Sequence, residues 1–310
     1  MTIHRIPKYP SKMPTAIFLD SGGVINDNAQ RAPQWLRYLG EFLPTTALGG
    51  TAQAWSMANA QIVRPFFSRW YEFMTQATEL AAQAQAANSN NKNGIETNVY
   101  RIFERLHLLI WIKEMCRAAF SQVPELETKV LPTLTDEDLL EIAQSAQKYA
   151  IERVKAAYPG AVETIHLLGE SKEYKLFTSS GDCFEDLEII LKGLGVFECF
   201  DAIYGSDKVN CLKMSALYYE KVFEQLGINV VKRDDAGEVV SSTDGEEEVV
   251  VLDDSDKVLR WARAHGARTV LITETELNLS LEVNRHIDYQ LRSLSELPAL
   301  LDSWREHLEN

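Results

Sequence analysis

The chain has 310 residues, which is long for a single compact core, so we expect one large domain or two smaller ones. Its composition, with 45% hydrophobic and 25% charged residues, is ordinary for a globular protein of enzyme size. The net charge of −14 argues against a nucleic-acid partner, because binding to a phosphate backbone depends on clustered Lys and Arg. It leaves room for a small anionic substrate, since a few cations or a metal can dominate one pocket.

The sequence also indicates where the protein works. No stretch approaches the ~18 consecutive apolar residues that a membrane span needs, and the N-terminal MTIHRIPKYPSKMP has no apolar core of a signal peptide. The 4 cysteines show no CxxC spacing and lie in apolar or helix-like contexts. We therefore expect a soluble, cytoplasmic protein with free thiols and no membrane partner.

A short strand is predicted first, in AIFLDSGGVINDN, because an apolar run ends in Asp20 and two glycines follow that favour a tight turn. From about residue 30 to 157, apolar residues recur at helical spacing, as in APQWLRYLGEFL, NVYRIFERLHLLIWIKEMCRAAF and DEDLLEIAQSAQKYAIERVKAAY. No strand is predicted in this stretch. The polar segment ANSNNKNG, residues 87–94, interrupts the helices and is predicted to be an exposed loop.

Strands and helices alternate after YPG, which ends at Gly160. The predicted helices are AVETIHLLGES, FEDLEIILKGLG, ALYYEKVFEQLG and KVLRWARAHG, and the predicted strands between and after them are YKLFTSS, FDAIYGSD, EEVVVLDDS, RTVLI and IDYQL. This alternation predicts an α/β fold, a Rossmann-like, doubly wound, mostly parallel sheet covered on both faces. Residues 232–248, KRDDAGEVVSSTDGEEE, are predicted to form a solvated and mobile loop because they are acidic and contain Gly and Ser.

The α/β pattern thus begins near residue 15, stops, and resumes near 159. We assign residues 1–29 and 158–310 to an α/β core domain and residues 30–157 to an inserted all-helical domain. In a doubly wound sheet, functional groups gather beyond the carboxyl ends of the strands. The polar residues at or just after the predicted strands are Asp20, Thr178, Ser179, Asp253 and Asp254. Lys213 lies just before the helix that follows the third predicted strand, FDAIYGSD.

This set of side chains has a chemical logic. Three carboxylates at one point repel one another unless a hard cation is present, and Mg²⁺ takes oxygen ligands of this kind. A carboxylate aimed at a phosphoryl group can act as a nucleophile. A lysine and a hydroxyl would hold the phosphoryl oxygens and offset the charge that builds up during transfer.

These segments resemble the motifs of the haloacid dehalogenase (HAD) superfamily of phosphatases and related hydrolases. FLDSGGVIND resembles the first motif, YKLFTSS the second, CLKMSALYYEKVFEQLGI the third and VVVLDDSDKVLRWARAHGARTVLI the fourth. YPGAVETIHLL and IDYQLRSLSELPALL extend the match, which covers residues 15–28 and about 159–301 but not the insert. The resemblance implies a phosphatase with a Mg²⁺ cofactor, a small phosphorylated metabolite as substrate, and a helical cap at the position of the insert.

The resemblance also implies roles for single residues. Asp20 matches the nucleophile, which is also a metal ligand, and Asp254 matches the acidic metal ligand, with Asp253 beside it either as a further ligand or as a residue that holds the ligands in place. Thr178 matches the phosphate-binding hydroxyl, with Ser179 next to it.

Lys213 matches the lysine that orients the nucleophile and the phosphate. The family usually has Pro after this lysine, where this chain has Met214, and Lys208 is an alternative. We prefer Lys213 because YYEKVFEQLG follows it at the family's offset.

Gly22 departs from the family pattern. Phosphatases of the family usually carry a second Asp two residues after the nucleophile, which protonates the leaving oxygen and then activates water. The register is sound, because Asp27 lies seven residues after Asp20, where the family often has another Asp. Glycine still offers the backbone carbonyl that the family uses as a metal ligand at this position.

Three interpretations of Gly22 stay open. The protein can be a phosphatase in which the proton comes from water or from a residue of the cap, or is not needed for a good leaving group. It can be a hydrolase of C–P or carbon–halogen bonds, since those branches also lack this Asp; the retained Asp253 and Asp254 argue against the halide branch, which does not need the metal. It can also be a catalytically impaired binding or scaffold protein.

The insert carries aromatic and basic side chains that could read a substrate. They are Arg31, Trp35, Arg64, Trp70 and Arg101. The alternative for each is helix packing or a solvated charge, and single residues of this kind usually have that role.

Overall fold

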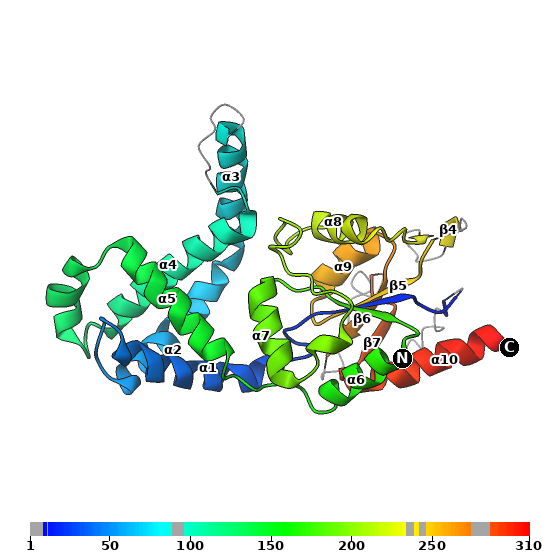
Figure 1. Cartoon of the computed structure of the whole chain (residues 1–310), viewed down its shortest axis with the longest axis horizontal. Coiled ribbons are helices and arrows are strands. Elements are labelled where there is room, and N and C mark those ends of the chain that lie inside the picture. The colour runs from blue at the N-terminus through cyan, green and yellow to red at the C-terminus, as the bar shows by residue number, and fades with distance from the viewer. Residues whose placement is uncertain (1–8, 11, 89–95, 234–238, 242–245, 274–285) are drawn as a thin grey trace, which may run out of the picture. The chain divides into compact units, whose positions relative to one another are not determined.

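The computed structural model describes the chain except for residues 1–8, 11, 89–95, 234–238, 242–245 and 274–285 (Figure 1). The chain divides into two compact units. The α/β unit comprises Met1–Asn28 and Ala156–Asn310, and the helical unit comprises Ala29–Lys155.

A five-stranded parallel sheet forms the centre of the α/β unit. Its strands, in spatial order, are β2 (Lys175–Thr178), β1 (Ala16–Leu19), β5 (Val249–Asp253), β6 (Arg268–Ile272) and β7 (Tyr289–Leu291). All four pairings are parallel. Leu19 at the end of β1 pairs with Thr178 on one side and Leu252 on the other, so the carboxyl ends of β2, β1 and β5 lie level with one another.

Helices cover both faces of this sheet, because successive side chains of a strand point to opposite faces. Ile17 and Leu19 belong to a core with α6 (Ala161–Ser171), α7 (Phe184–Leu194) and α10 (Leu297–Glu309). Ala16 and Phe18 belong to a second core with α8 (Leu217–Leu226) and α9 (Asp256–Ala264). Figure 1 shows the two helix layers on either side of the strands. The predicted doubly wound, Rossmann-like α/β fold is confirmed.

The helical unit contains no strand among its described residues. Its helices are α1 (Asn28–Phe42), α2 (Ala52–Ser68), α3 (Trp70–Asn88), α4 (Val99–Ala119) and α5 (Asp136–Ile151). Helix α4 packs against α2, α3 and α5, which explains why its apolar residues are not confined to one stripe. The side chain of Asn98 caps the start of α4, and Thr135 and Asp138 form a capping box at the start of α5.

The prediction of a strand in FDAIYGSD is wrong. Only Ala202 makes a bridge, a single parallel one to Phe177. Side chains interrupt the ladder, although the Asp201 N–H still donates to the Leu176 carbonyl at 2.8 Å. The Leu176 N–H donates to the Asp201 carboxylate at 2.8 Å, and the Thr178 hydroxyl exchanges hydrogen bonds with the backbone of Tyr204. Short polar side chains compete with backbone pairing in this way, so the segment lies beside β2 without becoming a strand.

The prediction of a solvated loop over residues 232–248 is also wrong in part. Strands β3 (Lys232–Arg233) and β4 (Val239–Ser241) form an antiparallel pair. Glu246 and Glu248 are buried, and Glu248 forms an ion pair with Arg268. The predicted loop over residues 87–94 begins inside α3, which continues to Asn88, and its remaining residues lie outside the described residues.

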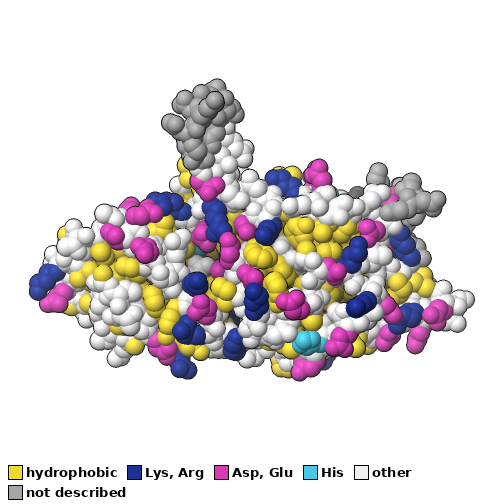
Figure 2. All heavy atoms as spheres, viewed as in Figure 1, with side chains coloured by type: hydrophobic (Ala, Val, Ile, Leu, Met, Phe, Trp, Pro, Cys, Tyr) yellow, Lys and Arg dark blue, Asp and Glu magenta, His cyan; other side chains and the backbone are white. Residues whose placement is uncertain are grey.

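Other features bear on the expected surroundings of the protein. None of the described helices combines the length and the apolar character needed to cross a membrane. All four cysteines are free thiols, three of them buried and Cys199 partly exposed. On the face shown in Figure 2, acidic and basic side chains are interspersed rather than gathered by sign.

Candidate active site

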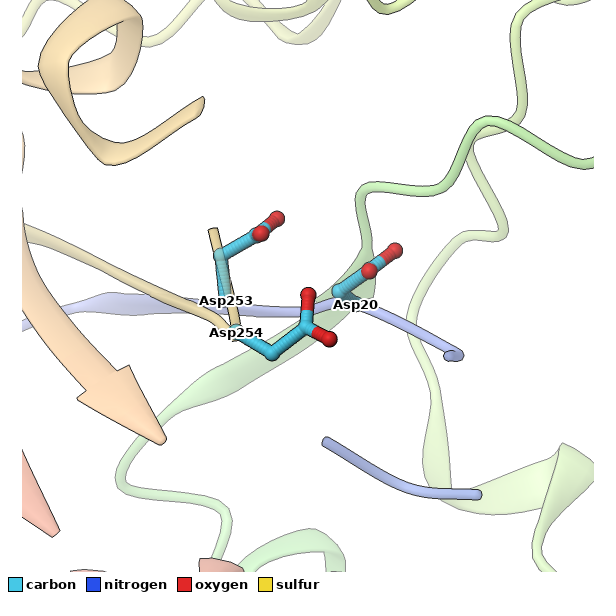
Figure 3. A group of neighbouring side chains, drawn as sticks. All are labelled: Asp20, Asp253 and Asp254. Atoms are coloured by element: carbon cyan, nitrogen blue, oxygen red, sulfur yellow. The ribbon is translucent and has the colours of Figure 1, made fainter. Parts of the chain in front are cut away.

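Three carboxylates meet at the carboxyl edge of the sheet. Asp20 follows β1, Asp253 ends β5 and Asp254 comes next, and each has an oxygen within 4.8 Å of an oxygen of the others (Figure 3). The Asp20 N–H donates to the Leu252 carbonyl at 3.1 Å, so sheet pairing fixes the start of the turn that carries Asp20. The parallel topology thus brings together residues more than 230 positions apart in the sequence.

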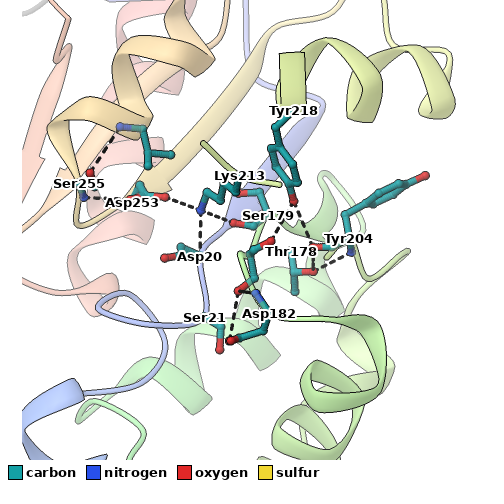
Figure 4. Close-up of polar contacts among 12 residues, drawn as sticks. Asp20, Ser21, Thr178, Ser179, Asp182, Tyr204, Lys213, Tyr218, Asp253 and Ser255 are labelled. Carbon is teal, nitrogen blue, oxygen red and sulfur yellow. Dashed lines mark hydrogen bonds and ion pairs between the residues drawn. The ribbon is translucent and has the colours of Figure 1, made fainter. Parts of the chain in front are cut away.

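Lys213 lies among these carboxylates. Its Nζ is 3.1 Å from Asp20 Oδ1 and 2.7 Å from Asp253 Oδ2, and it donates to the Ser179 carbonyl at 2.5 Å (Figure 4). The side chain is only 5% exposed. Lys208, the alternative from the sequence, instead places its Nζ 3.9 Å from the centre of the Phe184 ring. The structure therefore brings Lys213, and not Lys208, to the sheet edge.

Burial sets the electrostatics of the cluster. Burial raises the pKa of Asp20 to about 7, in spite of the opposing charge of Lys213 and with a contribution from the Asp253 carboxylate. Burial likewise raises the pKa of Asp253, again against the effect of Lys213. Burial disfavours the ammonium of Lys213, but the two carboxylates outweigh it and hold the Lys213 pKa well above its usual value. Three carboxylates face one ammonium, and a bound cation would offset the excess negative charge.

Asp253 and Asp254 have different surroundings. Both oxygens of Asp253 are engaged, Oδ2 by Lys213 and Oδ1 by the Ser255 N–H at 2.9 Å. The Asp254 carboxylate is exposed and accepts no hydrogen bond from another described residue. Asp254 is therefore the better placed of the two to bind an ion, while Asp253 positions Lys213.

The residues at the edge fit a hard divalent cation. Carboxylate oxygens from Asp20 and Asp254, separated by no more than a few ångströms, are the ligand type that Mg²⁺ prefers. The carbonyl of Gly22, which follows Asp20 in the same turn, accepts no hydrogen bond within the described part of the chain. One carboxylate oxygen each from Asp20 and Asp254, together with the Gly22 carbonyl, would hold Mg²⁺. Asp253 would not need to bind the ion, because Lys213 already engages its carboxylate.

The two glycines of the turn serve different purposes. Gly23 has φ of +79°, and a Cβ there would lie 2.1 Å from Asp254 Oδ2, so only glycine leaves room for that carboxylate. A Cβ at Gly22 would meet nothing closer than Asn28 Oδ1 at 3.4 Å, an ordinary contact. Packing therefore requires glycine at position 23 but does not require it at position 22.

The second motif is placed differently from the prediction. The Thr178 hydroxyl is fully buried and bonded to the backbone of Tyr204, at 3.1 Å to its carbonyl and 2.8 Å from its N–H. The prediction that Thr178 offers a phosphate-binding hydroxyl therefore disagrees with the structure. Ser179 reaches the site through its carbonyl, and its hydroxyl is buried beside that of Tyr219 without a hydrogen bond of normal geometry.

One residue near Asp20 was missed from the sequence. The negative charge of Asp182, in the loop after β2, contributes to the raised pKa of Asp20. The available signal was its position, four residues beyond Thr178 in FTSSGD, at the same edge of the sheet. Selecting the residues that end or directly follow a strand does not find Asp182, because it lies farther along the loop after β2.

Comparison with known proteins identifies the fold. No curated protein sequence matches this chain. The L-2-haloacid dehalogenase PA0810 is similar in structure, with a TM-score of 0.55, 15% identity and coverage of 94% of this chain and 99% of that chain. The defluorinating L-2-haloacid dehalogenase Rha0230 has a TM-score of 0.54 and 17% identity, with coverage of 96% and 100%.

A third similar structure is the HAD-hydrolase YfnB from Bacillus subtilis, bound to magnesium, with a TM-score of 0.51, 16% identity and coverage of 94% and 100%. At these identities the likeness concerns the fold alone. The sequence evidence is stronger, because the model of the family described as haloacid dehalogenase-like hydrolase matches residues 14–240, more than half of the chain. The chain therefore belongs to the haloacid dehalogenase-like hydrolases.

Proposed function

We propose that this hydrolase is a Mg²⁺-dependent phosphatase that cleaves small phosphate monoesters through Asp20. The observation that carries the proposal is the meeting of the Asp20, Lys213 and Asp254 side chains at one sheet edge. A carboxylate nucleophile, a buried ammonium and a second acidic ligand are the groups that phosphoryl transfer through an aspartyl-phosphate requires.

Each residue has a defined part in the reaction. Asp20 attacks phosphorus, the bond to the ester oxygen breaks, and water later cleaves the bond between phosphorus and the Asp20 oxygen. Lys213, 3.1 Å from Asp20, holds the attacking carboxylate and offsets charge on the phosphoryl oxygens. Mg²⁺ bound by Asp20, Asp254 and the Gly22 carbonyl would shield the nucleophile from the phosphoryl charge. Asp253 keeps Lys213 in place through its 2.7 Å hydrogen bond.

The helical unit fits the role of a cap, and we extend the proposal to it, with residues 1–29 and 158–310 as the core and 30–157 as the cap. Such a domain would exclude water and read the leaving group of a small phosphorylated metabolite. Four of its candidate readers have side-chain partners. Trp70 lies edge-on to Phe103 at 5.0 Å, Arg101 pairs with Glu104 at 3.3 Å, and the Arg31 guanidinium lies 5.7 Å from the centre of the Trp35 ring. The free thiols favour a reducing compartment such as the cytoplasm.

The charge of the site favours phosphate esters over haloacids. A 2-haloacid brings its own carboxylate and releases a halide, and the three carboxylates here are opposed by the single ammonium of Lys213. Without a bound cation that excess repels an anionic substrate. With one, the same site suits a phosphate.

The test is a substrate panel with and without Mg²⁺. It includes 4-nitrophenyl phosphate, alkyl and sugar phosphates, a phosphonate and an L-2-haloacid, for the parent protein and Asp20→Asn. We expect the parent to release phosphate only when Mg²⁺ is present, and to recover this activity when Mg²⁺ is added back after chelation. Asp20→Asn should release no phosphate under either condition. Asp256→Asn removes a carboxylate from the first turn of α9, two residues from Asp254, and is the matched control that should keep activity.

Two outcomes contradict the proposal. Halide release without Mg²⁺ would assign the protein to carbon–halogen chemistry. Equal inertness of the parent and Asp20→Asn across the panel would leave a catalytically impaired binding protein.

A further inference from the structure

The proposed reaction needs a proton donor that Gly22 cannot supply. When the bond between phosphorus and the ester oxygen breaks, that oxygen leaves as an alkoxide unless an acid protonates it. Packing does not exclude a carboxylate at position 22, because a Cβ there would make only ordinary contacts. A phosphatase with a glycine there needs an acid from another position when its leaving group is poor.

We propose that Asp182 is the general acid and base of this hydrolase, an inference that rests on the proposed phosphatase function. Asp182 lies in the short loop between β2 and α7, and β2 is the strand next to β1. The Ser179 N–H donates to the Leu19 carbonyl at 3.0 Å, so the loop starts level with Asp20. Asp182 therefore stands at the edge of the sheet where Asp20 would be phosphorylated.

The loop holds Asp182 in place. The Asp182 N–H donates to Ser180 Oγ at 3.2 Å, and the Asp182 carbonyl accepts from the Ser206 N–H at 3.2 Å. Gly205 packs so closely that a Cβ there would lie 2.3 Å from the Asp182 carbonyl oxygen. The Phe184 N–H at the start of α7 donates to the Asp207 carboxylate at 2.9 Å, so it is Asp207, and not Asp182, that caps this N–H. A fixed backbone is what a proton-transfer group requires.

The Asp182 carboxylate keeps an open side. One oxygen accepts a long hydrogen bond, 3.4 Å, from Ser180 Oγ, and the other has no partner in the described part of the chain. The side chain is partly exposed, and a Cβ at the neighbouring Gly181 would meet no atom within 4 Å. In Figure 4, Asp182 lies on the side of Asp20 away from Asp253. The negative charge of Asp182 helps to raise the pKa of Asp20, although the two side chains do not share a hydrogen bond.

The proposed steps balance. In the first, Asp20 bonds to phosphorus, the bond from phosphorus to the ester oxygen breaks, and the proton of the Asp182 carboxyl passes to that oxygen to give the alcohol. In the second, the Asp182 carboxylate takes a proton from water, whose oxygen bonds to phosphorus. The bond from phosphorus to Asp20 breaks, and inorganic phosphate leaves with Asp182 protonated again.

The test uses the dependence on the leaving group, because a merely structural role would slow all substrates alike. With Mg²⁺, the full-length parent and Asp182→Asn are assayed on ethyl phosphate, a poor leaving group, and 4-nitrophenyl phosphate, a good one. We expect Asp182→Asn to lower kcat/KM by about 10²–10⁴-fold for ethyl phosphate and by less than about tenfold for 4-nitrophenyl phosphate. Because water activation is also lost, nitrophenolate should appear in a burst followed by slow turnover.

Two further variants complete the design. Glu185→Gln removes an exposed carboxylate three residues away and controls for the change in charge. Gly22→Asp with Asp182→Asn should recover much of the ethyl phosphate activity, since position 22 accepts a side chain. An equal fall of kcat/KM on both substrates, or no fall, overturns the role of Asp182. If the parent shows no turnover that depends on Asp20, the phosphatase proposal itself fails and the inference falls with it.

Discussion

The two units differ in the burial of their ion pairs. The α/β unit buries ion pairs: Lys213 with Asp253, Arg263 with Asp288 and Arg268 with Glu248, all with side chains no more than 5% exposed. In the helical unit, pairs such as Arg105 with Glu137 and Lys129 with Glu125 lie at the surface, with every side chain more than half exposed.

The difference follows from architecture. Parallel strands begin together at one edge of the sheet and end together at the other, and at each edge several side chains and backbone groups converge and can hold a charge with several hydrogen bonds at once. Lys213 and Asp253 lie at the carboxyl edge. Glu248 and Arg268 lie where β5 and β6 begin. Packed helices meet through side chains, and the interior of the helical unit is mainly apolar, with aliphatic residues and packed rings. Among the rings, His107 stacks on Phe103 at 4.5 Å and lies edge-on to Trp70 at 5.1 Å. Chemistry that needs buried charge therefore belongs to the α/β unit, and the helical unit offers shape and apolar surface.

The largest stability effect should come from a buried pair. Arg268→Met would leave Glu248 buried without its partner, and it would also remove the hydrogen bond to the Tyr9 carbonyl at 3.1 Å. We expect the free energy of unfolding, measured in urea, to fall by about 3–5 kcal/mol.

The matched control is Arg105→Met in the helical unit, whose exposed pair with Glu137 should leave the midpoint unchanged within error. Adding Glu248→Leu to Arg268→Met should recover much of the loss. Equal effects of the two arginine substitutions would remove the contrast between the units.

The second effect concerns the one buried histidine that we describe in the helical unit. Burial lowers the pKa of His107 from 6.5 to about 4, while its Nδ1 lies 2.8 Å from the Phe103 carbonyl. Between these pH values the unfolded chain binds a proton that the folded one does not, so stability falls as pH falls from 6.5 to about 4. The loss should be about 3 kcal/mol.

His107→Gln should lack this component. Urea unfolding of the parent and of His107→Gln at a series of pH values measures it as the pH dependence of their difference. If the unfolding free energies of the two proteins changed with pH in the same way, burial would not lower the pKa of His107, and the prediction would be wrong.

The smallest effect separates the two glycines of the turn. Gly23→Ala places a methyl group on a residue with φ of +79° and against Asp254, and should cost about 1–3 kcal/mol of stability and weaken Mg²⁺-dependent activity. Gly22→Ala, which meets only Asn28 at 3.4 Å, should change the unfolding free energy by less than about 0.5 kcal/mol. Thermal unfolding and Mg²⁺ titration of activity compare the two, and a similar loss in both variants would contradict the different roles of the glycines.

Much of the α/β unit was predictable because its signals are local. β6 coincides with RTVLI, and β5 ends in the first Asp of the predicted DD pair, since an apolar run that stops at carboxylates marks a buried strand and its end. Lys213 was separable from Lys208 by its offset from the following helix, α8.

The failures come from interactions between distant residues. The strand in FDAIYGSD did not form because the Asp201 and Thr178 side chains take hydrogen bonds that a continuous backbone ladder would use. The side chains of Thr178 and Ser179 point in opposite directions because successive residues of a strand do so. A shift of one residue in the predicted register therefore changes which hydroxyl is assigned to the site. The burial of Glu248 depends on Arg268, twenty positions on, and is not visible in an acidic segment read by itself.

The most direct test is to find the phosphoryl group itself. During Mg²⁺-supported turnover of 4-nitrophenyl phosphate, rapid acid quenching and tandem mass spectrometry of the protein should locate a phosphoryl group on Asp20, which is 3.1 Å from Lys213. The label should be absent from Asp20→Asn and should accumulate in Asp182→Asn, where water activation is lost. Turnover without a phosphoryl group on Asp20, or a label on another residue, would contradict the assignment of Asp20 as the nucleophile.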